Sequence, residues 1–312
     1  MSDILYDVII IGGGPAGLSA GIYSGRGLLK TLVIEKSKHG GQAGVTNEID
    51  NYPGADLEET GPSLIAKMVK QAERFGVDFI TDDITDVKLD GDIKTLTGSK
   101  GTYTAKAVII ATGAFPRTLG CRGEKELTGK GVSYCATCDA AFFEELEVYV
   151  VGGGDSAVQE AMFIARFARK ITIIQNLPEL TAAKSLQQKV LNDPKFSFVY
   201  NSVVEELKGE EGLLDTIIIK NEQTGELTEF KADEEDGTFG LFVFIGLIPN
   251  TEIFTGKVEM DRGYFHTDEN MRTKVPGVYA IGDCRVKPLR QVVTAAADGA
   301  IAAMDIERLL SE

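Results

Sequence analysis

The sequence predicts an α/β protein with two similar domains, one inserted into the other. A unit of strand, glycine-rich turn and helix opens the chain, with its turn at residues 12–17, and a second such unit has its turn at residues 152–157. The runs 107–111 and 277–281 each predict a buried strand. Thr-Gly follows the first run, and Gly-Asp follows the second. A chain of 312 residues with 43% hydrophobic content is long enough to fill two cores.

The first unit has every part of a dinucleotide-binding site. The apolar run 6–11 predicts a buried parallel strand, and the turn GGGPAG follows it directly. Its glycines allow a tight turn, close approach of the backbone to a pyrophosphate, and packing of the next helix, whose N-terminal amides face the anion. A second strand over 31–34 ends in Glu35, whose carboxylate can accept hydrogen bonds from a ribose. The alternative, a glycine turn without a ligand, does not explain the acid at this spacing.

The second unit repeats the pattern and sets the domain boundaries. It predicts a strand over 148–151, a helix over 156–168 and a strand over 171–174 around the turn GGGDSA. The repeat predicts an outer domain of residues 1–116 and 247–312 and an inserted domain of residues 117–246, with a hinge-like exit at 246–249. We expect each to be a Rossmann-like, three-layer ββα domain.

Other segments predict the remaining elements of the outer domain. Residues 63–75 form an amphipathic pattern typical of a helix, and residues 77–110 alternate short strand patterns with turns. The glycine- and proline-rich stretches 40–42 and 51–54 indicate loops, and loops at the carboxyl ends of parallel strands are where α/β proteins bind ligands. A helix rich in small residues is expected from 290 to about 306.

The inserted domain carries a pair of cysteines that predicts redox chemistry. Cys135 and Cys138 are separated by two residues, so they can close a small disulfide, and a thiolate held there has a lowered pKa. Asp139 follows at once, where a carboxyl group could exchange a proton with a leaving or attacking sulfur. These three residues are the predicted catalytic group.

A zinc site and a structural disulfide account less well for the cysteine pair. Zinc needs four ligands, but Cys121 and Cys284 stand alone and the two histidines, His39 and His266, are isolated, so no metal site is predicted. A structural disulfide is rare in the cytosol. The N-terminal sequence has no basic signal region, and no apolar run approaches 18 residues, so we expect a cytoplasmic protein that does not enter a membrane. A net charge of −15 disfavours nucleic-acid binding.

Taken together and in order, the motifs resemble a known family. GGGPAG at 12–17, ATG at 111–113, CATCD at 135–139, GGGDSA at 152–157, GD at 282–283 and RQVVTAAADG at 290–299 are similar to those of the low-molecular-weight, flavin-dependent thioredoxin reductases. The resemblance implies an FAD domain made of both chain ends, an inserted NAD(P)H-binding-like domain that carries the dithiol, a homodimer, and reduction of the disulfide of thioredoxin. It also implies that Cys138 is the sulfur nearer the flavin and that Cys135 attacks the substrate.

The resemblance also implies a set of FAD contacts, carried over by position. They are Gly12, Gly14, Pro15, Ala16, Gly17, Glu35, Gly41, Gln42, Asn51, Ala111, Thr112, Gly113, Gly282, Asp283, Arg290, Gln291 and Val292.

The second glycine turn departs from the family pattern in the segment that follows its second strand. The usual enzymes of the family carry His-Arg-Arg there, with a further Arg four positions later, and these residues grip the 2′-phosphate of NADPH. Here residues 175–181 read QNLPELT, and no arginine occurs between Arg169 and Arg262. Gln175 also lacks the carboxylate that would hold the ribose of NADH. We expect a degenerate nucleotide site, the alternative being that NADH still binds through the glycine turn.

Because residues 175–181 lack the arginines that bind NADPH, another electron donor has to be considered. A minority branch that resembles this sequence takes electrons from reduced ferredoxin, and we expect ferredoxin as the donor and as a protein partner. Arg166, Arg169 and Lys170 could receive an acidic partner, although three charges at a helix end more often serve solvation. The alternatives are a thioredoxin reductase that uses NADH or NADPH, a flavin dithiol oxidase that uses O2, and a redox sensor without turnover.

Overall fold

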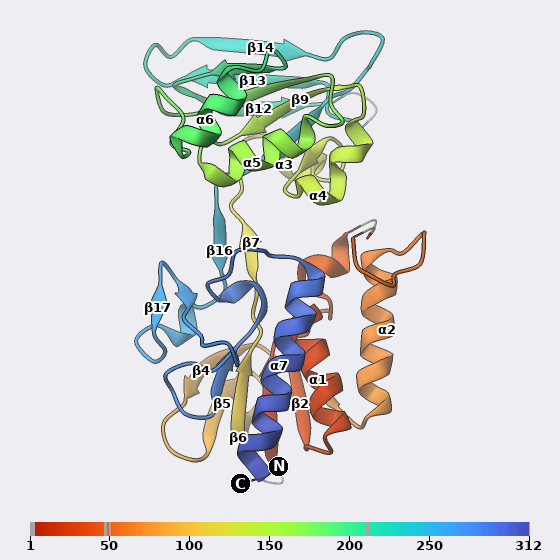
Figure 1. Cartoon of the computed structure of the whole chain (residues 1–312), viewed down its shortest axis with the longest axis vertical. Coiled ribbons are helices and arrows are strands. Elements are labelled where there is room, and N and C mark those ends of the chain that lie inside the picture. The colour runs from red at the N-terminus through yellow and green to blue at the C-terminus, as the bar shows by residue number, and fades with distance from the viewer. Residues whose placement is uncertain (1–3, 47–48, 50, 210–211, 312) are drawn as a thin grey trace. The chain divides into compact units, whose positions relative to one another are not determined.

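The computed structural model describes residues 4–46, 49, 51–209 and 212–311, and the chain divides into two compact units (Figure 1). Unit 1 comprises Met1–Phe115 and Ile248–Glu312, and unit 2 comprises Pro116–Leu247. In the part of the chain that the structure describes, no helix is both long and apolar enough to cross a bilayer.

The sheet of unit 1 is built from both ends of the chain. Its strands run in the order β3-β2-β1-β6-β5-β4, and β19 pairs with the second half of β6. The pairs among β3, β2, β1, β6 and β19 are parallel, whereas β5 is antiparallel to both β6 and β4. Val8, Ile9 and Ile10 are fully buried, as expected of a parallel strand covered on both faces. The strands are β1 Leu5–Ile11, β2 Thr31–Glu35, β3 Asp78–Thr81, β4 Ile84–Lys88, β5 Lys94–Gly98, β6 Thr102–Ile110 and β19 Val278–Ala280.

Helices α1, α2 and α7 lie together in unit 1 (Figure 1). Helices α1 and α7 approach closely because Gly299 of α7 has no side chain: a Cβ there would lie 2.3 Å from the carbonyl oxygen of Ala16. Thr60 begins α2 with a capping box in which its hydroxyl accepts from the Ser63 amide. The elements are α1 Pro15–Arg26, η1 Gly41–Val45, α2 Gly61–Arg74, η3 Glu252–Phe254, β17 Met260–Asp261, β18 Tyr264–Phe265, η4 Gly282–Cys284 and α7 Val292–Ser311.

Unit 2 has three layers. A parallel sheet in the order β11-β10-β9-β15-β8 has one apolar cluster on its helical side, around Val158 and Ile171, and another on the side of the antiparallel sheet β12-β13-β14, around Leu207 and Ile217. The elements are α3 Glu124–Leu127, β8 Val132–Ser133, α4 Ala136–Asp139, η2 Ala140–Phe143, β9 Glu147–Val151, α5 Asp155–Ile164, β10 Lys170–Ile174, α6 Lys184–Leu191, β11 Phe196–Val199, β12 Ser202–Lys208, β13 Thr216–Asn221, β14 Leu227–Lys231 and β15 Gly240–Val243. The predicted α/β class with Rossmann-like sheets is confirmed.

Three segments differ from the sequence prediction. The helix expected over 156–168 ends at Ile164, because the amides of Arg166 and Phe167 bond to carbonyls three residues back and tighten the chain into turns. Helix α7 begins at Val292 and continues to Ser311, five residues beyond the expected end. The expected hinge at 246–249 contains a strand, β16 Leu247–Pro249, which pairs with β7 Ala114–Pro116.

Candidate active site

Cys135 and Cys138 form a disulfide in unit 2, with their Cα atoms 5.3 Å apart and both residues half-buried. Strand β8 pairs in parallel with β15 and ends two residues before Cys135, so the dithiol follows the carboxyl end of a sheet strand. Helix α4 begins directly after Cys135, and the Asp139 amide donates to the Cys135 carbonyl at 3.2 Å. The predicted redox pair is therefore placed by the sheet on one side and by a short helical turn on the other.

Asp139 lies in this turn, and its carboxyl group has a raised proton affinity. Burial raises the pKa of Asp139, while a hydrogen bond from the Ser133 hydroxyl, 2.5 Å from Asp139 Oδ2, opposes that rise only in part. A carboxyl group with a raised pKa holds its proton at a pH closer to neutrality. Asp139 is thus suited to donate a proton beside the dithiol.

Ser133 is a residue of this site that sequence reasoning missed. It is only 4% exposed, and besides its bond to Asp139 its Oγ accepts from the Cys135 amide at 3.1 Å. Its position two residues before the first cysteine is the one available sequence signal, and serine is also common in ordinary turns. The described part of the chain holds no cluster of three or more His, Cys, Asp or Glu arranged to ligate a metal.

The first glycine turn shows which glycines the protein itself requires. Gly12 has φ +113°, and a Cβ there would lie 2.3 Å from the carbonyl oxygen of Ala111, while a Cβ at Gly17 would lie 2.0 Å from that of Gly12. At Gly14 the nearest atom to such a Cβ is 3.9 Å away. Packing within the chain therefore does not explain the glycine at 14, whereas close approach of a pyrophosphate would.

Glu35 lies at the end of β2 beside this turn, as the sequence predicts. Its Oε2 accepts from the Gly13 amide at 2.7 Å and its Oε1 from the Ser37 amide at 3.2 Å. His39, which was not among the predicted contacts, lies on the same side: its ring meets Phe79 edge-on at 5.1 Å between centroids, and a Cβ at Gly13 would lie 2.4 Å from its Nδ1.

Several buried polar atoms in unit 1 have no hydrogen-bond partner within the described chain. They are Ser24 Oγ, His39 Nδ1, Thr112 Oγ1, Asp283 Oδ1 and Arg290 Nε. Buried polar groups are almost always hydrogen-bonded, so this set fits a polar ligand bound in unit 1. Three of the five, Thr112, Asp283 and Arg290, are predicted FAD contacts, and we conclude that the residues present fit that cofactor.

Asp283 and Arg290 have further features that suit a buried polar ligand. Burial raises the pKa of Asp283, against the lowering effect of Lys287 and Arg290. The Arg290 guanidinium lies over the ring of Tyr264, 4.6 Å from its centroid. A carboxyl group of this kind can offer a hydrogen-bond acceptor to ligand hydroxyls.

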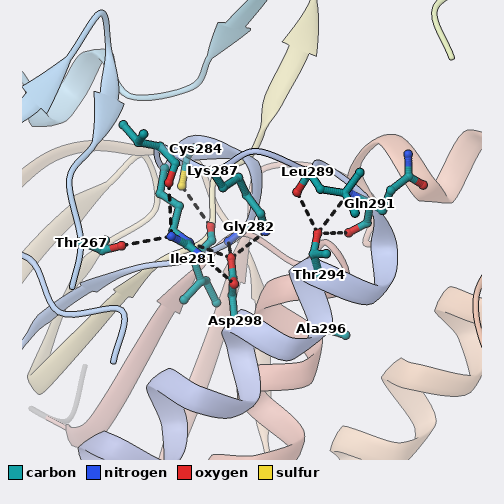
Figure 2. Close-up of polar contacts among 12 residues, drawn as sticks. Thr267, Ile281, Gly282, Cys284, Lys287, Leu289, Gln291, Thr294, Ala296 and Asp298 are labelled. Atoms are coloured by element: carbon teal, nitrogen blue, oxygen red, sulfur yellow. Dashed lines mark hydrogen bonds and ion pairs between the residues drawn. The ribbon is translucent and has the colours of Figure 1, made fainter. Parts of the chain in front are cut away.

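A buried ion cluster fastens the turn that carries Asp283 to helix α7 (Figure 2). Asp298 of α7 accepts from the Gly282 amide at 3.0 Å, from Arg285 twice at 2.9 Å, and from Lys287 Nζ at 2.8 Å. Burial alone would raise the pKa of Asp298, but the hydrogen bonds from Arg285 and Lys287 outweigh it, so that pKa lies below its ordinary value. The cluster holds an ionised carboxylate between two cations.

The other predicted contacts also lie in unit 1. Asn51 Nδ2 donates to Gln291 Oε1 at 3.1 Å, which joins the loop after η1 to the start of α7. The remaining residues are placed as follows: Pro15 and Ala16 open α1, Gly41 and Gln42 lie in η1, Ala111 and Gly113 follow β6, Gly282 begins η4, and Val292 begins α7. The predicted cofactor contacts thus belong to unit 1 and the dithiol group to unit 2.

The second glycine turn keeps the geometry of the first but not its chemistry. Gly152 has φ +127°, and a Cβ there would lie 2.4 Å from the Phe244 carbonyl oxygen. Gln175 is only 5% exposed and lies over Gly153, but its amide bonds to its own loop: Nε2 donates to the Glu179 carbonyl at 3.4 Å, and Oε1 accepts from the Asn176 amide at 3.1 Å. Gln175 therefore does not reproduce the bond that Glu35 makes to its glycine turn.

The loop beside this turn offers one carboxylate, and the cation nearest to that carboxylate is at the start of α6. The Thr181 and Ala182 amides hold the loop against the Gly153 carbonyl at 2.8 and 3.0 Å, and the loop carries the carboxylate of Glu179. Lys184, at the start of α6, lies 4.0 Å from that carboxylate.

Two of the three basic residues, Arg169 and Lys170, are paired with carboxylates within unit 2, and all three lie beyond the end of α5 at Ile164. Arg169 pairs with Asp236 at 2.7 Å and with Asp233 at 3.0 Å, and Lys170 pairs with Glu147 at 3.2 Å. The cluster therefore gives no support to a docking role for an acidic partner.

Comparison with known proteins agrees with the geometry. The family model described as pyridine nucleotide-disulphide oxidoreductase matches residues 6–299. A thioredoxin reductase from Peptoclostridium acidaminophilum is 58% identical over 305 residues, 97% of this chain and 96% of that protein. A thioredoxin reductase from Listeria monocytogenes is 44% identical over 309 residues, 99% of this chain and 95% of that protein. The crystal structure of thioredoxin reductase from Streptococcus pyogenes is similar with a TM-score of 0.91, at 41% identity over 99% of both chains.

Proposed function

Since the chain belongs to the pyridine nucleotide-disulphide oxidoreductase family, we propose that it is a thioredoxin reductase whose electrons come from reduced ferredoxin. It is an FAD-dependent oxidoreductase that acts on a disulfide. The observation that carries the assignment as a disulfide reductase is the Cys135–Cys138 disulfide with the half-buried carboxyl group of Asp139 in the same turn.

The proposed chemistry at the dithiol balances in electrons and protons. The Cys135–Cys138 bond opens by taking up two electrons, and Asp139 protonates one of the two sulfurs as it leaves. The Cys135 thiolate then attacks one sulfur of the thioredoxin disulfide, which breaks that bond and releases the other sulfur of thioredoxin as a thiolate. Cys138, which carries the proton from Asp139, next gives up that proton and attacks Cys135, so the enzyme disulfide forms again. The two thioredoxin sulfurs take up that proton and a second one from water, and thioredoxin leaves with two thiols.

FAD, when bound, supplies the two electrons. We propose that the turn at Gly14 approaches its pyrophosphate, that Glu35 accepts from its ribose, and that Thr112, Asp283 and Arg290 contact its other polar groups. The buried unpartnered atoms of these last three residues support the assignment.

Two alanine variants test this placement. Gly14→Ala is expected to fold, because Gly14 has φ −79° and a Cβ there meets no atom within 3.9 Å, yet to weaken FAD binding about tenfold or more because the pyrophosphate is held off. Gly17→Ala, the matched control for a purely steric role, is expected to reduce folding, because its Cβ would lie 2.0 Å from the Gly12 carbonyl oxygen. Titration of the refolded apoprotein with FAD measures the first effect and thermal unfolding the second. Unchanged FAD affinity in Gly14→Ala would count against the proposed pyrophosphate site.

The second glycine turn counts against NADPH as the donor, and for that reason we propose another donor, ferredoxin. Residues 175–181 carry no cation, Gln175 bonds within its own loop, and the nearby Lys184 faces Glu179. Recognition of a 2′-phosphate depends on arginine contacts that this loop does not offer.

Anaerobic reduction of the bound flavin separates the possible donors. NADPH, NADH and dithionite-reduced ferredoxin are offered in turn, and bleaching of the flavin absorbance is followed. Bleaching by ferredoxin alone is the expected result. Fast bleaching by either nucleotide would mean that the enzyme is a thioredoxin reductase that uses NADH or NADPH. Rapid peroxide formation from O2 with a small dithiol would favour a dithiol oxidase.

Restoring the missing arginines gives a test in the opposite direction. We expect Asn176→Arg with Leu177→Arg and Thr181→Arg to increase NADPH affinity by about tenfold or more, because each charged hydrogen bond to a phosphate contributes about 1.5–3 kcal/mol. All three positions are exposed, so the substitutions disturb no core. The same changes to glutamine serve as the uncharged control. If the arginine variant gains no NADPH-dependent bleaching, this loop does not limit nucleotide use.

We also propose a cytoplasmic homodimer. Apolar side chains exposed on α7, Val293, Ile301, Met304 and Leu309, support a partner surface on that helix. A molar mass of one chain, 33.6 kDa, measured by light scattering of the holoenzyme, would overturn the proposed dimer. Recovery of the protein in the exported fraction of cells would overturn the proposed location.

A further inference from the structure

We propose that Ser133 is a positioning residue for proton transfer at the dithiol, because its single hydroxyl holds the Asp139 carboxyl group and the Cys135 backbone in a fixed relation. The inference rests on the proposed function, in which Asp139 protonates a leaving sulfur. It assigns a role to a side chain that does not itself touch a reacting atom.

The hydrogen bonds of Ser133 connect the two groups directly. Its Oγ lies 3.1 Å from the Cys135 amide nitrogen, 2.5 Å from Asp139 Oδ2 and 3.4 Å from the Cys135 carbonyl oxygen. The Cys135 amide can only donate, so Ser133 accepts there. The hydroxyl has one hydrogen to give, and the much shorter distance assigns it to Asp139 when that carboxyl group is ionised.

The same geometry suits the protonated carboxyl group without movement of any heavy atom. A proton on Asp139 Oδ2 can point at Ser133 Oγ, and the Ser133 hydrogen can then turn to the Cys135 carbonyl oxygen. Ser133 thus stays hydrogen-bonded in both protonation states of Asp139. The Asp139 carboxyl group gives up and regains a proton in each cycle of the proposed reaction. The Ser133 hydroxyl holds it in the same position throughout that cycle.

Ser133 is held by the sheet rather than by the cysteine turn. It is the last residue of β8 and is paired with Phe242 of β15, and it is 4% exposed. Its hydroxyl is therefore a rigid reference point for the turn that follows. Asp139, by contrast, lies at the end of a four-residue helix, which has little rigidity of its own.

The electrostatic effect of Ser133 has a definite sign. Burial raises the pKa of Asp139 and the hydrogen bond from Ser133 lowers it, and these are the two causes of its shift. Helix α5, which packs against α4, carries Asp155 and Glu160, but neither contributes to that shift. Asp155 instead accepts from the Ala183 amide at 2.6 Å, and burial raises the pKa of Glu160. Removing the Ser133 hydroxyl should raise the pKa of Asp139 further.

The test is a single turnover followed over a range of pH. Holoenzyme fully reduced with dithionite is mixed anaerobically with a purified, oxidised bacterial thioredoxin, and recovery of the flavin absorbance is timed, so the result does not depend on the natural electron donor. Opening of the disulfide needs protonated Asp139, so recovery slows as the pH rises through the pKa of Asp139. For Ser133→Ala we expect this decline at higher pH, together with a maximal rate lowered about five- to tenfold by the loss of positioning.

The control variants distinguish the possible failures. Ser133→Thr keeps the hydroxyl and should reproduce the original pH profile. Asp139→Asn should remove the decline in rate with rising pH. In the double variant, Ser133→Ala should then have no further effect. A normal profile in Ser133→Ala, with an altered one in Asp139→Asn, would overturn the role of Ser133 and leave the proposed function standing. Absence of flavin recovery in the unaltered enzyme would overturn the proposed function itself. Flavin content and the unfolding midpoint confirm folding, and Ser133→Gly repeats the measurement if Ser133→Ala does not fold.

Discussion

Replacement of Cys138 with serine is expected to abolish thioredoxin reduction while FAD remains bound. A serine hydroxyl cannot form or break the bond that Cys138 makes with Cys135, so electrons cannot pass from the flavin to the substrate. We expect the steady-state rate to fall below about a thousandth of its original value, as for the loss of a covalent catalytic group. Flavin absorbance should be retained, because every predicted FAD contact lies in unit 1 and Cys138 lies in unit 2.

Cys121 provides the matched control within the same unit. Its thiol is half-buried, and burial, aided by the nearby Glu124, raises its pKa to about 12, so almost none of it is the reactive thiolate at neutral pH. Cys121→Ser should therefore keep nearly full activity. Thioredoxin reduction that survives in Cys138→Ser would mean that the Cys135–Cys138 disulfide is not the route of the electrons.

Replacement of Asp298 with alanine is expected to destabilise unit 1 strongly and to weaken its hold on FAD. The variant leaves Lys287, whose side chain is 3% exposed, and the mostly buried Arg285 without their shared carboxylate. Breaking a buried ion pair from one side costs about 3–5 kcal/mol in the free energy of unfolding. The turn that carries Asp283 also loses its attachment to α7, so FAD affinity should fall. Thermal unfolding and FAD titration of the apoprotein measure the two effects.

An exposed ion pair gives the comparison for Asp298. Asp233→Ala removes one partner of Arg169, but both side chains are exposed and Arg169 keeps Asp236, so we expect little change in the free energy of unfolding. Equal effects of the two substitutions would show that the Asp298 cluster contributes no more than a surface pair.

The stability contributed by Asp298 should also depend on pH. Its pKa is lowered in the folded chain, so its contribution is fully present above the unfolded-state pKa, about 3.9, and is lost as the pH falls through the folded value. Asp298→Asn should therefore make stability less sensitive to acid below about pH 4. Unfolding midpoints measured in a series of acidic buffers would show the difference.

The parts of the site that the sequence predicts are those fixed by local sterics or by covalent spacing. Gly12 and Gly17 fit because no side chain can occupy the space beside the neighbouring carbonyls, and a turn of this kind after an apolar strand is recognisable from residue order alone. The cysteine pair is recognisable because two intervening residues bring the sulfurs within bonding reach. Glu35 reaches the first turn as predicted, since a parallel strand pair sets its distance from the glycines.

Other features depend on contacts that the sequence does not encode locally. Ser133, His39 and the Asp298 cluster owe their surroundings to side-chain directions and to partners brought together by folding. Apart from the place of Ser133 just before the cysteine pair, their immediate sequence does not distinguish them. The sequence shows that position 175 lacks a carboxylate. It does not show that the Gln175 side-chain amide forms hydrogen bonds to its own loop. The early end of α5 was missed because Ala165 and Arg166 are good helix formers that give no stop signal.

The pairing of β7 with β16 makes the inserted unit a removable module. Because these two short strands are hydrogen-bonded neighbours, with the Arg117 amide donating to the Gly246 carbonyl at 2.9 Å, the chain leaves and re-enters unit 1 at adjacent points. A tight turn in place of residues 117–246 could join the two strands as an ordinary hairpin, with the main sheet of unit 1 left unchanged. A gene could therefore gain, lose or exchange the dithiol-bearing segment in one recombination event, and unit 1 would keep its own fold.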